Sequence, residues 1–225
     1  MAKTERRADH GDEALHALRH STAHVMAGAV LELFPEAKFG FGPPVADGFY
    51  YDFELPRSLT PDDLVAIEDR MRAMVKADLP FERSAMAAPE ARAFFDARGQ
   101  DFKVDQIDKL EETVGENAVG IYRHGSFVDL CRGPHVERTS KIGPFKLLSI
   151  AGAYWRGDEK SAQLQRVYGT VWETQADLDA YLARLAALRR EYGTERKPFE
   201  IHVIALEAYT LDGVCDDDNL APDYG

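Results

Sequence analysis

The stretch RHSTAHVMAGAV, residues 19–30, lies in a longer segment that has the periodicity of a helix. Apolar residues recur three or four positions apart from about Glu13 to Phe34, and Pro35 ends the pattern. His20 and His24 are one helical turn apart, so we expect both imidazoles on the same face. Such a pair can share a metal ion, act together on a reacting group, or simply pack.

Beyond this helix both helical and extended segments are expected, and from Ala118 onward the pattern changes to short strands. Further helices are expected at residues 61–78, where Thr60 is the N-cap, and at 89–99, 105–114 and about 174–192. The strand candidates are GFYYDFEL, FERSAMA, VGIYRHG, SFVDLC, FKLLSIAGAYW and LQRVYGTVW. Helices early and strands late predict an α+β fold, with an antiparallel or mixed sheet packed against helices.

The chain divides by composition into a leader, one domain and a tail. Residues 1–12 are charged and aperiodic, which predicts a flexible leader. Residues 13–193 hold the readable periodicity and are expected to form the domain. Residues 194–225 remain unassigned, because IHVIALEAYTL fits either a strand or a short helix.

Composition excludes several classes of protein. With 45% hydrophobic and 29% charged residues, the chain is typical of a soluble globular protein. It has no membrane-length apolar run, no secretory signal and only two cysteines, so we expect a cytoplasmic location. The net charge of −12 argues against a general nucleic-acid coat protein. Any RNA contact should therefore come from local basic groups, namely Arg123, Arg132, Lys141, Lys146, Arg156, Lys160 and Arg166.

A second pair of metal-ligating residues, Cys131 and His135 in DLCRGPH, repeats the spacing of the two histidines. Three imidazoles and a thiolate make a reasonable tetrahedral zinc set, provided that the fold brings the two pairs together. A zinc-protease helix would place Glu directly after the first His, and Ser21 occupies that position, which excludes this class. Metal binding, metal-free catalysis and simple packing all stay open on these residues.

Asp129 is unusual because it lies in the apolar strand candidate SFVDLC. Strand alternation places it on the same side as Cys131. It is therefore either part of the same site or an ion-pair partner of Arg132 or Arg123.

Other polar residues are less informative. Tyr50 and Tyr51 should occupy opposite faces of their strand, so only one can enter the core. The surroundings of Lys103, QDFKVDQ, fit a solvated lysine as well as they fit a functional one. GFGPP at residues 40–44 is a glycine-rich turn, but it lacks a complete GxGxxG pattern, which excludes a dinucleotide site.

Several stretches taken together resemble the editing region of threonyl-tRNA synthetases. In chain order they are RHSTAH, FGPPVADGFYYDF, CRGPHV and AGAYWRGDEKSAQLQRVYGTVW. The related alanyl-tRNA editing domains share the two metal-ligand pairs and a tyrosine-rich strand, whereas AGAYWRGD and LQRVYGT favour the threonyl branch. The resemblance extends from about Ala14 to Arg190.

The resemblance implies the editing-domain fold and hydrolysis of mischarged Ser-tRNA(Thr). The positions that it marks as catalytic are His20, His24, Lys103 and His135, and those that line a serine pocket are Tyr51, Asp129 and Cys131. Threonyl editing sites imply hydrolysis without a metal or other cofactor, whereas alanyl sites would hold zinc on His20, His24, Cys131 and His135. The implied partners are the acceptor end of serine-charged tRNA(Thr) and a full-length synthetase.

The chain also departs from the family pattern. Family members begin with a ubiquitin-like domain and continue into a class II aminoacylation domain, whereas here only a short leader precedes the editing region and about 30 residues follow it. We therefore expect no aminoacylation activity, as for an isolated editing domain that is either natural or truncated. The alternative is a non-catalytic module that binds tRNA or a synthetase, or an inactive synthetase fragment.

Overall fold

The computed structural model describes residues 9–115 and 117–192. In chain order, the elements are α1 (Asp9–Leu33), β1 (Lys38–Phe39), β2 (Pro44–Val45), β3 (Gly48–Glu54), α2 (Pro61–Lys76), β4 (Glu82–Ala87), α3 (Ala88–Asp96), α4 (Asp101–Val114), β5 (Ala118–His124), β6 (Phe127–Leu130), the 3₁₀ turn η1 (Thr139–Lys141), β7 (Phe145–Tyr154), the 3₁₀ turn η2 (Trp155–Gly157), β8 (Gln163–Val171) and α5 (Gln175–Tyr192). The predicted α+β class is confirmed.

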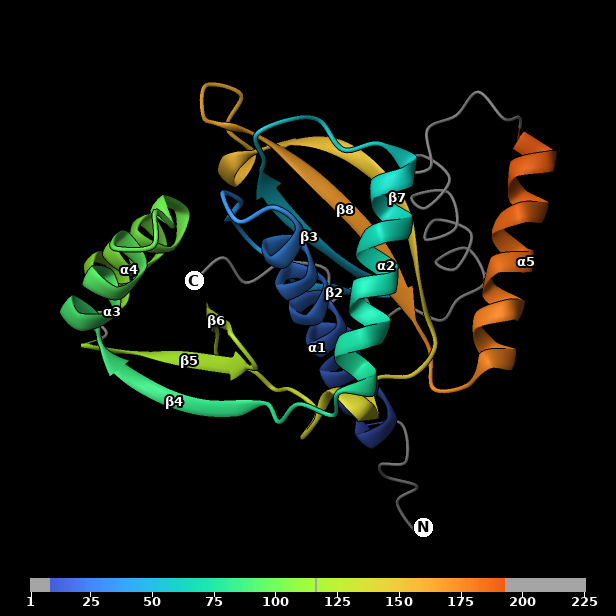
Figure 1. The fold of residues 1–225 in the computed structure, drawn as a ribbon, viewed down its shortest axis with the longest axis horizontal. Coiled ribbons are helices and arrows are strands. Elements are labelled where there is room, and N and C mark those ends of the chain that lie inside the picture. Colours follow the sequence, from blue (N-terminus) through green and yellow to red (C-terminus); the bar gives the residue numbers. More distant parts are fainter. Residues whose placement is uncertain (1–8, 116, 193–225) are drawn as a thin grey trace, which may run out of the picture.

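The strands form two antiparallel sheets, a division that the sequence pattern did not reveal. The larger sheet has the order β1-β3-β8-β7, and β2 also pairs with β3. The smaller sheet has the order β4-β5-β6. Figure 1 shows α1 crossing the middle of the molecule between the larger sheet and the smaller one, with α3 and α4 at the far side of the smaller sheet. This central position of α1 creates the site described below.

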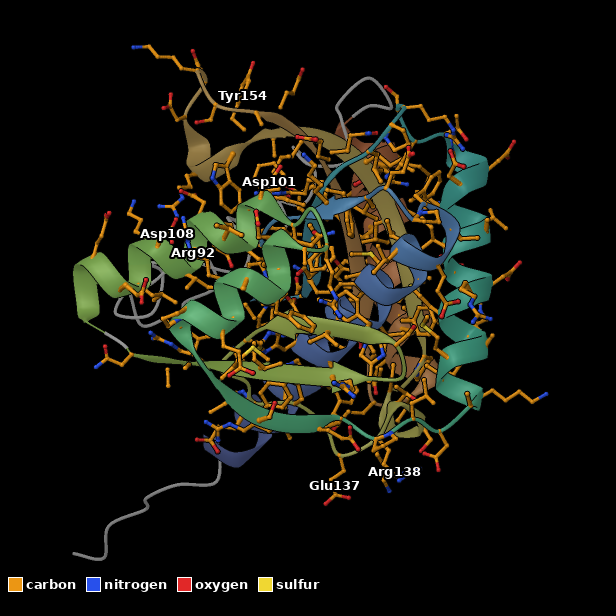
Figure 2. All side chains as sticks on the ribbon, turned by 60° about the vertical axis from the view of Figure 1, so that its left-hand side comes forward. Arg92, Asp101, Asp108, Glu137, Arg138 and Tyr154 are labelled. Atoms are coloured by element: carbon orange, nitrogen blue, oxygen red, sulfur yellow. The ribbon has the colours of Figure 1, made fainter. Side chains whose placement is uncertain are left out.

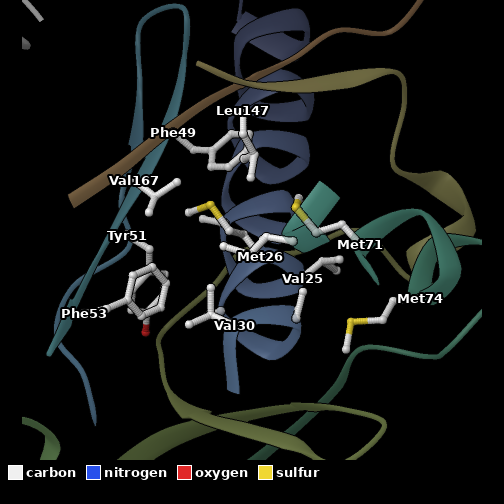
Figure 3. Packing of buried hydrophobic residues seen from close by; sticks show 14 of the residues in the cluster. Val25, Met26, Val30, Phe49, Tyr51, Phe53, Met71, Met74, Leu147 and Val167 are labelled. Atoms are coloured by element: carbon white, nitrogen blue, oxygen red, sulfur yellow. The ribbon is translucent and has the colours of Figure 1, made fainter. Parts of the chain in front are cut away.

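The core forms where α1 meets β3 and α2. Figure 3 shows Val25, Met26 and Val30 of α1 between Phe49, Tyr51 and Phe53 of β3 and the two methionines of α2, Met71 and Met74. Every residue of α1 from 21 to 30 is buried, because neighbours surround this part of the helix on all sides. Small side chains are therefore needed: a Cβ on Gly28 would lie 2.9 Å from the His124 ring.

The helix boundaries follow local signals where these exist. Thr60 is the N-cap of α2, as predicted, and forms a capping box with Asp63. By contrast, α4 begins at Asp101, before the predicted 105, and its N-cap Gln100 makes no side-chain cap bond that would mark the start. Helix α1 begins at Asp9, ahead of its apolar pattern. The predicted tail, 194–225, lies outside the described residues.

Two groups of contacts lie on the outside of the molecule, away from the central site. Tyr181 and Leu185 of α5 pack with Leu148 and Trp172 on the other side of the larger sheet. An ion pair between Arg92 and Asp108 joins α3 to α4 on the exterior (Figure 2). Within the described ranges, no helix is both long and apolar enough to cross a membrane.

Candidate active site

The fold brings together the two pairs that lie far apart in the sequence. His20 and His24 project from α1, while Cys131 and His135 lie in the loop that follows β6, and one donor atom from each lies within 4.8 Å of the others. Cys131 Sγ is 3.3 Å from His20 Nε2 and 3.2 Å from His135 Nε2. The expectation that the two histidines share one helix face is confirmed.

Two glycines allow the Cys131 loop to take this path. The backbone N–H of Cys131 donates to Gly120 O at 2.9 Å, and a Cβ on Gly120 would lie 2.5 Å from the carbonyl oxygen of Cys131. Gly133 has a φ of 81°, a conformation that favours glycine, and a Cβ there would meet the Tyr122 hydroxyl at 2.4 Å. The turn at Gly133 then returns His135 to the cluster.

A second polar group, formed by Lys103, Asp129 and Tyr51, lies beside the first. Lys103 Nζ is 2.7 Å from Asp129 Oδ1, and the Tyr51 hydroxyl donates to Asp129 Oδ2 at 2.6 Å. All three side chains are buried. Lys103 is therefore not the solvated lysine that its sequence context allowed, and it is the ion-pair partner of Asp129 in place of the predicted Arg132 or Arg123. As predicted, only one tyrosine of the strand pair enters the core: Tyr51 is buried.

The glycine-rich turn after β1 closes this group from one side. Gly40 O accepts from Lys103 Nζ at 2.7 Å and the Tyr51 hydroxyl accepts at 3.1 Å, while the Asp129 carboxylate is the ion-pair partner of the ammonium group. A Cβ on Gly42 would lie 2.0 Å from the Tyr51 ring. This turn thus holds the lysine and the tyrosine in place.

His24 connects the two groups into one site. Its Nε2 lies 3.6 Å from Asp129 Oδ2, and its ring centroid is 4.9 Å from that of His20 and 4.4 Å from that of His135. The seven residues singled out in the sequence therefore meet at one place, between α1, the smaller sheet, β3 and α4.

Burial sets the protonation of the cluster. Loss of water, and secondarily the charge of His16, lowers the pKa of His20 to about 4. Burial likewise holds the pKa values of His24 and His135 well below the usual value for histidine. For Cys131, burial raises the thiol pKa to about 12, with the Asp129 carboxylate adding to the effect. At neutral pH the imidazoles are therefore uncharged and the thiol keeps its proton.

The donor set fits a zinc ion in type, and two of its distances fit in spacing, although the four donor atoms lie up to 4.8 Å apart. Tetrahedral zinc, with Zn–S near 2.3 Å and Zn–N near 2.0 Å, separates a sulfur from a nitrogen ligand by about 3.5 Å. The two Sγ···Nε2 distances, 3.3 and 3.2 Å, lie close to that value and also suit S–H···N hydrogen bonds. The four residues can thus hold a metal or form a metal-free polar cluster.

Sequence reasoning missed two residues of the site's surroundings. His124 is buried and its Nε2 lies 3.1 Å from the carbonyl oxygen of His24. Phe81 stacks on the His135 ring, with centroids 5.0 Å apart. Strand alternation carried a signal for His124, since its pairing with Phe127, two positions from Asp129, places it on the same face of the smaller sheet as that aspartate.

Four of the seven basic residues expected to contact RNA have surroundings that bear on this role. Three of them pair with carboxylates: Lys146 with Glu68, Arg156 with Asp105 and Arg166 with Asp52. Arg123 is exposed and, together with Arg98 and Phe94, lines a groove of about 470 Å³. The groove combines two cations with aromatic surface.

Comparison with known proteins identifies relatives of the region that contains this site. Residues 119–168, which include Asp129, Cys131 and His135, match the family model of the threonyl and alanyl tRNA synthetase second additional domain. A threonine–tRNA ligase of Acidithiobacillus ferrooxidans is 50% identical over 193 residues, which cover 84% of this chain and 30% of the relative. That of Dehalococcoides mccartyi is 53% identical over 192 residues, or 84% of this chain and 32% of the relative. The chain thus spans about 30% of the length of these relatives. Residues 119–168 thus contain the threonyl and alanyl tRNA synthetase second additional domain, and 84% of the chain corresponds to the editing region of threonine–tRNA ligases.

Proposed function

We propose that this chain hydrolyses the ester bond of serine mischarged onto tRNA(Thr). The observation that carries the proposal is the convergence of a neutral imidazole–thiol cluster with the buried Lys103–Asp129–Tyr51 group in one site. The proposal is supported by the similarity to threonine–tRNA ligases, whose name gives threonine and tRNA as the molecules that these relatives join.

Energetics give a reason for such a reaction. Serine lacks one methyl group of threonine, and a single methyl or methylene is worth only about 1–3 kcal/mol of discrimination. A synthetase that accepts the threonine hydroxyl therefore also accepts serine at a costly frequency. A second site that admits the serine ester and excludes the extra methyl of threonine corrects these errors.

The chemistry requires a water molecule, stabilisation of the developing oxyanion and a proton for the leaving ribose hydroxyl. His20 is suited to hold the water, because its neutral Nε2 can accept a proton while its Nδ1 faces the Pro134 carbonyl. With a pKa of about 4 it is a weak base, so it orients the water and takes up the proton only as negative charge develops on the ester. The proposed role of Lys103 is electrostatic: its buried positive charge favours that negative charge.

Cys131 serves to shape the pocket and does not attack the ester. Its thiol pKa of about 12 leaves almost no thiolate at neutral pH, and its sulfur already contacts His20 and His135. Tyr51 and Asp129 are fixed by their short mutual hydrogen bond and are proposed to bind the serine moiety. Hydrolysis therefore proceeds by direct attack of water.

We assign the reaction no metal requirement, although zinc would be held by His20, His24, Cys131 and His135. When bound there, zinc would polarise a water molecule or the ester carbonyl. In the metal-free route that we propose, the Lys103 ammonium beside the cluster meets the negative charge that develops on the ester.

The partner is the acceptor end of the tRNA. The groove lined by Arg98, Arg123 and Phe94 supports this assignment, because arginine and aromatic side chains bind phosphates and unstacked bases. A full-length synthetase is a second proposed partner, as the source of the mischarged tRNA. The proposed location is the cytoplasm, where aminoacyl-tRNA is made and used.

Deacylation of defined substrates tests the proposal. Ser-tRNA(Thr), Thr-tRNA(Thr) and Ser-tRNA(Ala) are each incubated with the protein, and we expect loss of the seryl ester of tRNA(Thr) alone. His20→Ala should slow the reaction about 100-fold or more. Glu13→Ala, at an exposed position two turns away on the same helix, is the control and should retain activity. Equal hydrolysis of all three esters, or none, contradicts the proposal; binding of tRNA without turnover supports the non-catalytic module.

A further inference from the structure

Ser21, between the two histidines of α1, is completely buried and makes three polar contacts. Its Oγ lies 2.7 Å from Ala17 O, 2.9 Å from the backbone N of Val136 and 3.1 Å from His135 Nδ1. Like His20, it joins α1 directly to the loop bearing His135. The proposed reaction assigns it no role.

These contacts determine where the hydroxyl proton lies. Two oxygen atoms 2.7 Å apart need a proton between them, and the Ala17 carbonyl has none to give. The proton of Ser21 therefore points at Ala17 O, and its oxygen can only accept from the other two neighbours. Val136 supplies its backbone N–H, so His135 Nδ1 must carry a proton as well.

The same reasoning holds for His20, whose Nδ1 is 3.2 Å from Pro134 O. A carbonyl oxygen only accepts, so the neutral His20 ring also carries its proton on Nδ1. Both rings then turn an Nε2 lone pair toward Cys131 Sγ, at 3.3 and 3.2 Å. The Cys131 thiol has one proton, so it can donate to only one of these two Nε2 atoms. The lone pair of the other Nε2 stays free to accept from water or to bind a cation.

We infer that Ser21 is a positioning residue that fixes His135 in the tautomer protonated on Nδ1, so that its Nε2 lone pair faces the reacting centre. The inference rests on the proposed hydrolysis for its functional consequence, but the tautomer itself is a property of the free protein. Without the Ser21 acceptor, the proton moves to Nε2 and donates to Cys131, and the cluster loses the free acceptor.

Nitrogen NMR of protein labelled in histidine reads the tautomer directly. Long-range proton–nitrogen correlations, with His135→Gln used for assignment, should show Nδ1–H in the wild type. Ser21→Ala should shift His135 toward Nε2–H. Thr22→Val is the matched control, because Thr22 is equally buried and its hydroxyl bonds to Leu18 O at 2.8 Å without reaching a histidine. It should leave the spectrum unchanged.

Activity gives an independent readout. Ser21→Ala should lower kcat about 10- to 100-fold, the usual cost of losing the group that orients a working histidine, whereas Thr22→Val should not. An Nε2–H tautomer in the wild type, or an unchanged tautomer in folded Ser21→Ala, overturns the inference even if Ser21→Ala were inactive. If the tautomer behaves as stated and no ester is hydrolysed, the proposed function fails and the role of Ser21 in orienting His135 stands.

Discussion

The ammonium nitrogen of Lys103 lies 2.7 Å from Asp129 Oδ1, and both side chains are almost fully withdrawn from water. The lysine comes from α4 and the aspartate from β6, so their contact ties the helical layer to the smaller sheet. Removal of one partner leaves a buried charge without a counter-charge, which costs far more stability than the loss of an exposed ion pair.

Lys103→Met is therefore expected to lower the free energy of unfolding by about 3–5 kcal/mol, because the Asp129 carboxylate loses its counter-charge. Adding Asp129→Asn should recover part of that loss, and a double-mutant cycle in urea measures the coupling. The control is Lys38, whose ion pair with Asp101 is equally short but exposed; Lys38→Ala should cost about 1 kcal/mol or less. Additive losses at Lys103 and Asp129 contradict the pairing.

Two strand glycines of the larger sheet should respond differently to alanine. A Cβ on Gly48 would lie 2.1 Å from the backbone oxygen of Gly169, which cannot move without breaking the pairing of β3 with β8. Gly48→Ala should therefore destabilise the protein by about 2 kcal/mol or more. The nearest atom to a Cβ on Gly152 is 3.6 Å away, so Gly152→Ala should be neutral or slightly stabilising. Thermal unfolding compares the two, and similar losses would refute the close packing at Gly48.

Stability should fall as the pH drops below 6.5. Burial lowers the histidine pKa values in the folded protein, to about 4 for His20, so the unfolded chain binds more protons below its own value near 6.5. Each such histidine then lowers the free energy of unfolding by up to about 1.4 kcal/mol per pH unit. Urea titrations between pH 6.5 and 5.5 in chelator-treated buffer measure the slope. His135→Gln should have a shallower slope than the wild type; equal slopes would show that His135 is not held neutral.

Removal of metal should leave the proposed reaction intact. If the water is oriented by His20 without zinc, treatment with a strong chelator changes the rate of Ser-tRNA(Thr) hydrolysis less than about twofold. Metal analysis of the protein before and after treatment accompanies the rate measurement. Loss of activity that zinc restores would assign the four-residue cluster to a metal mechanism.

The sequence predicted which residues form the site better than it predicted how they are arranged. Helical spacing placed His20 and His24 on one face, and strand alternation placed Asp129 beside Cys131. Resemblance alone brought Lys103 into the site, because nothing in QDFKVDQ signals a buried lysine. No local pattern indicated that Ser21 would meet His135, a contact between residues 114 positions apart.

The sequence by itself determined the class of fold, most of the helices and strands and the pairs of reactive residues, because these depend on periodicity and spacing within a few residues. Only the tertiary structure decided that the strands divide into two sheets with α1 between them, that Lys103 is buried against Asp129, and that the imidazoles of His20 and His135 present the same nitrogen to Cys131. Burial, pKa and tautomer depend on which distant groups displace water around a side chain, and that is set by the packing of the whole chain.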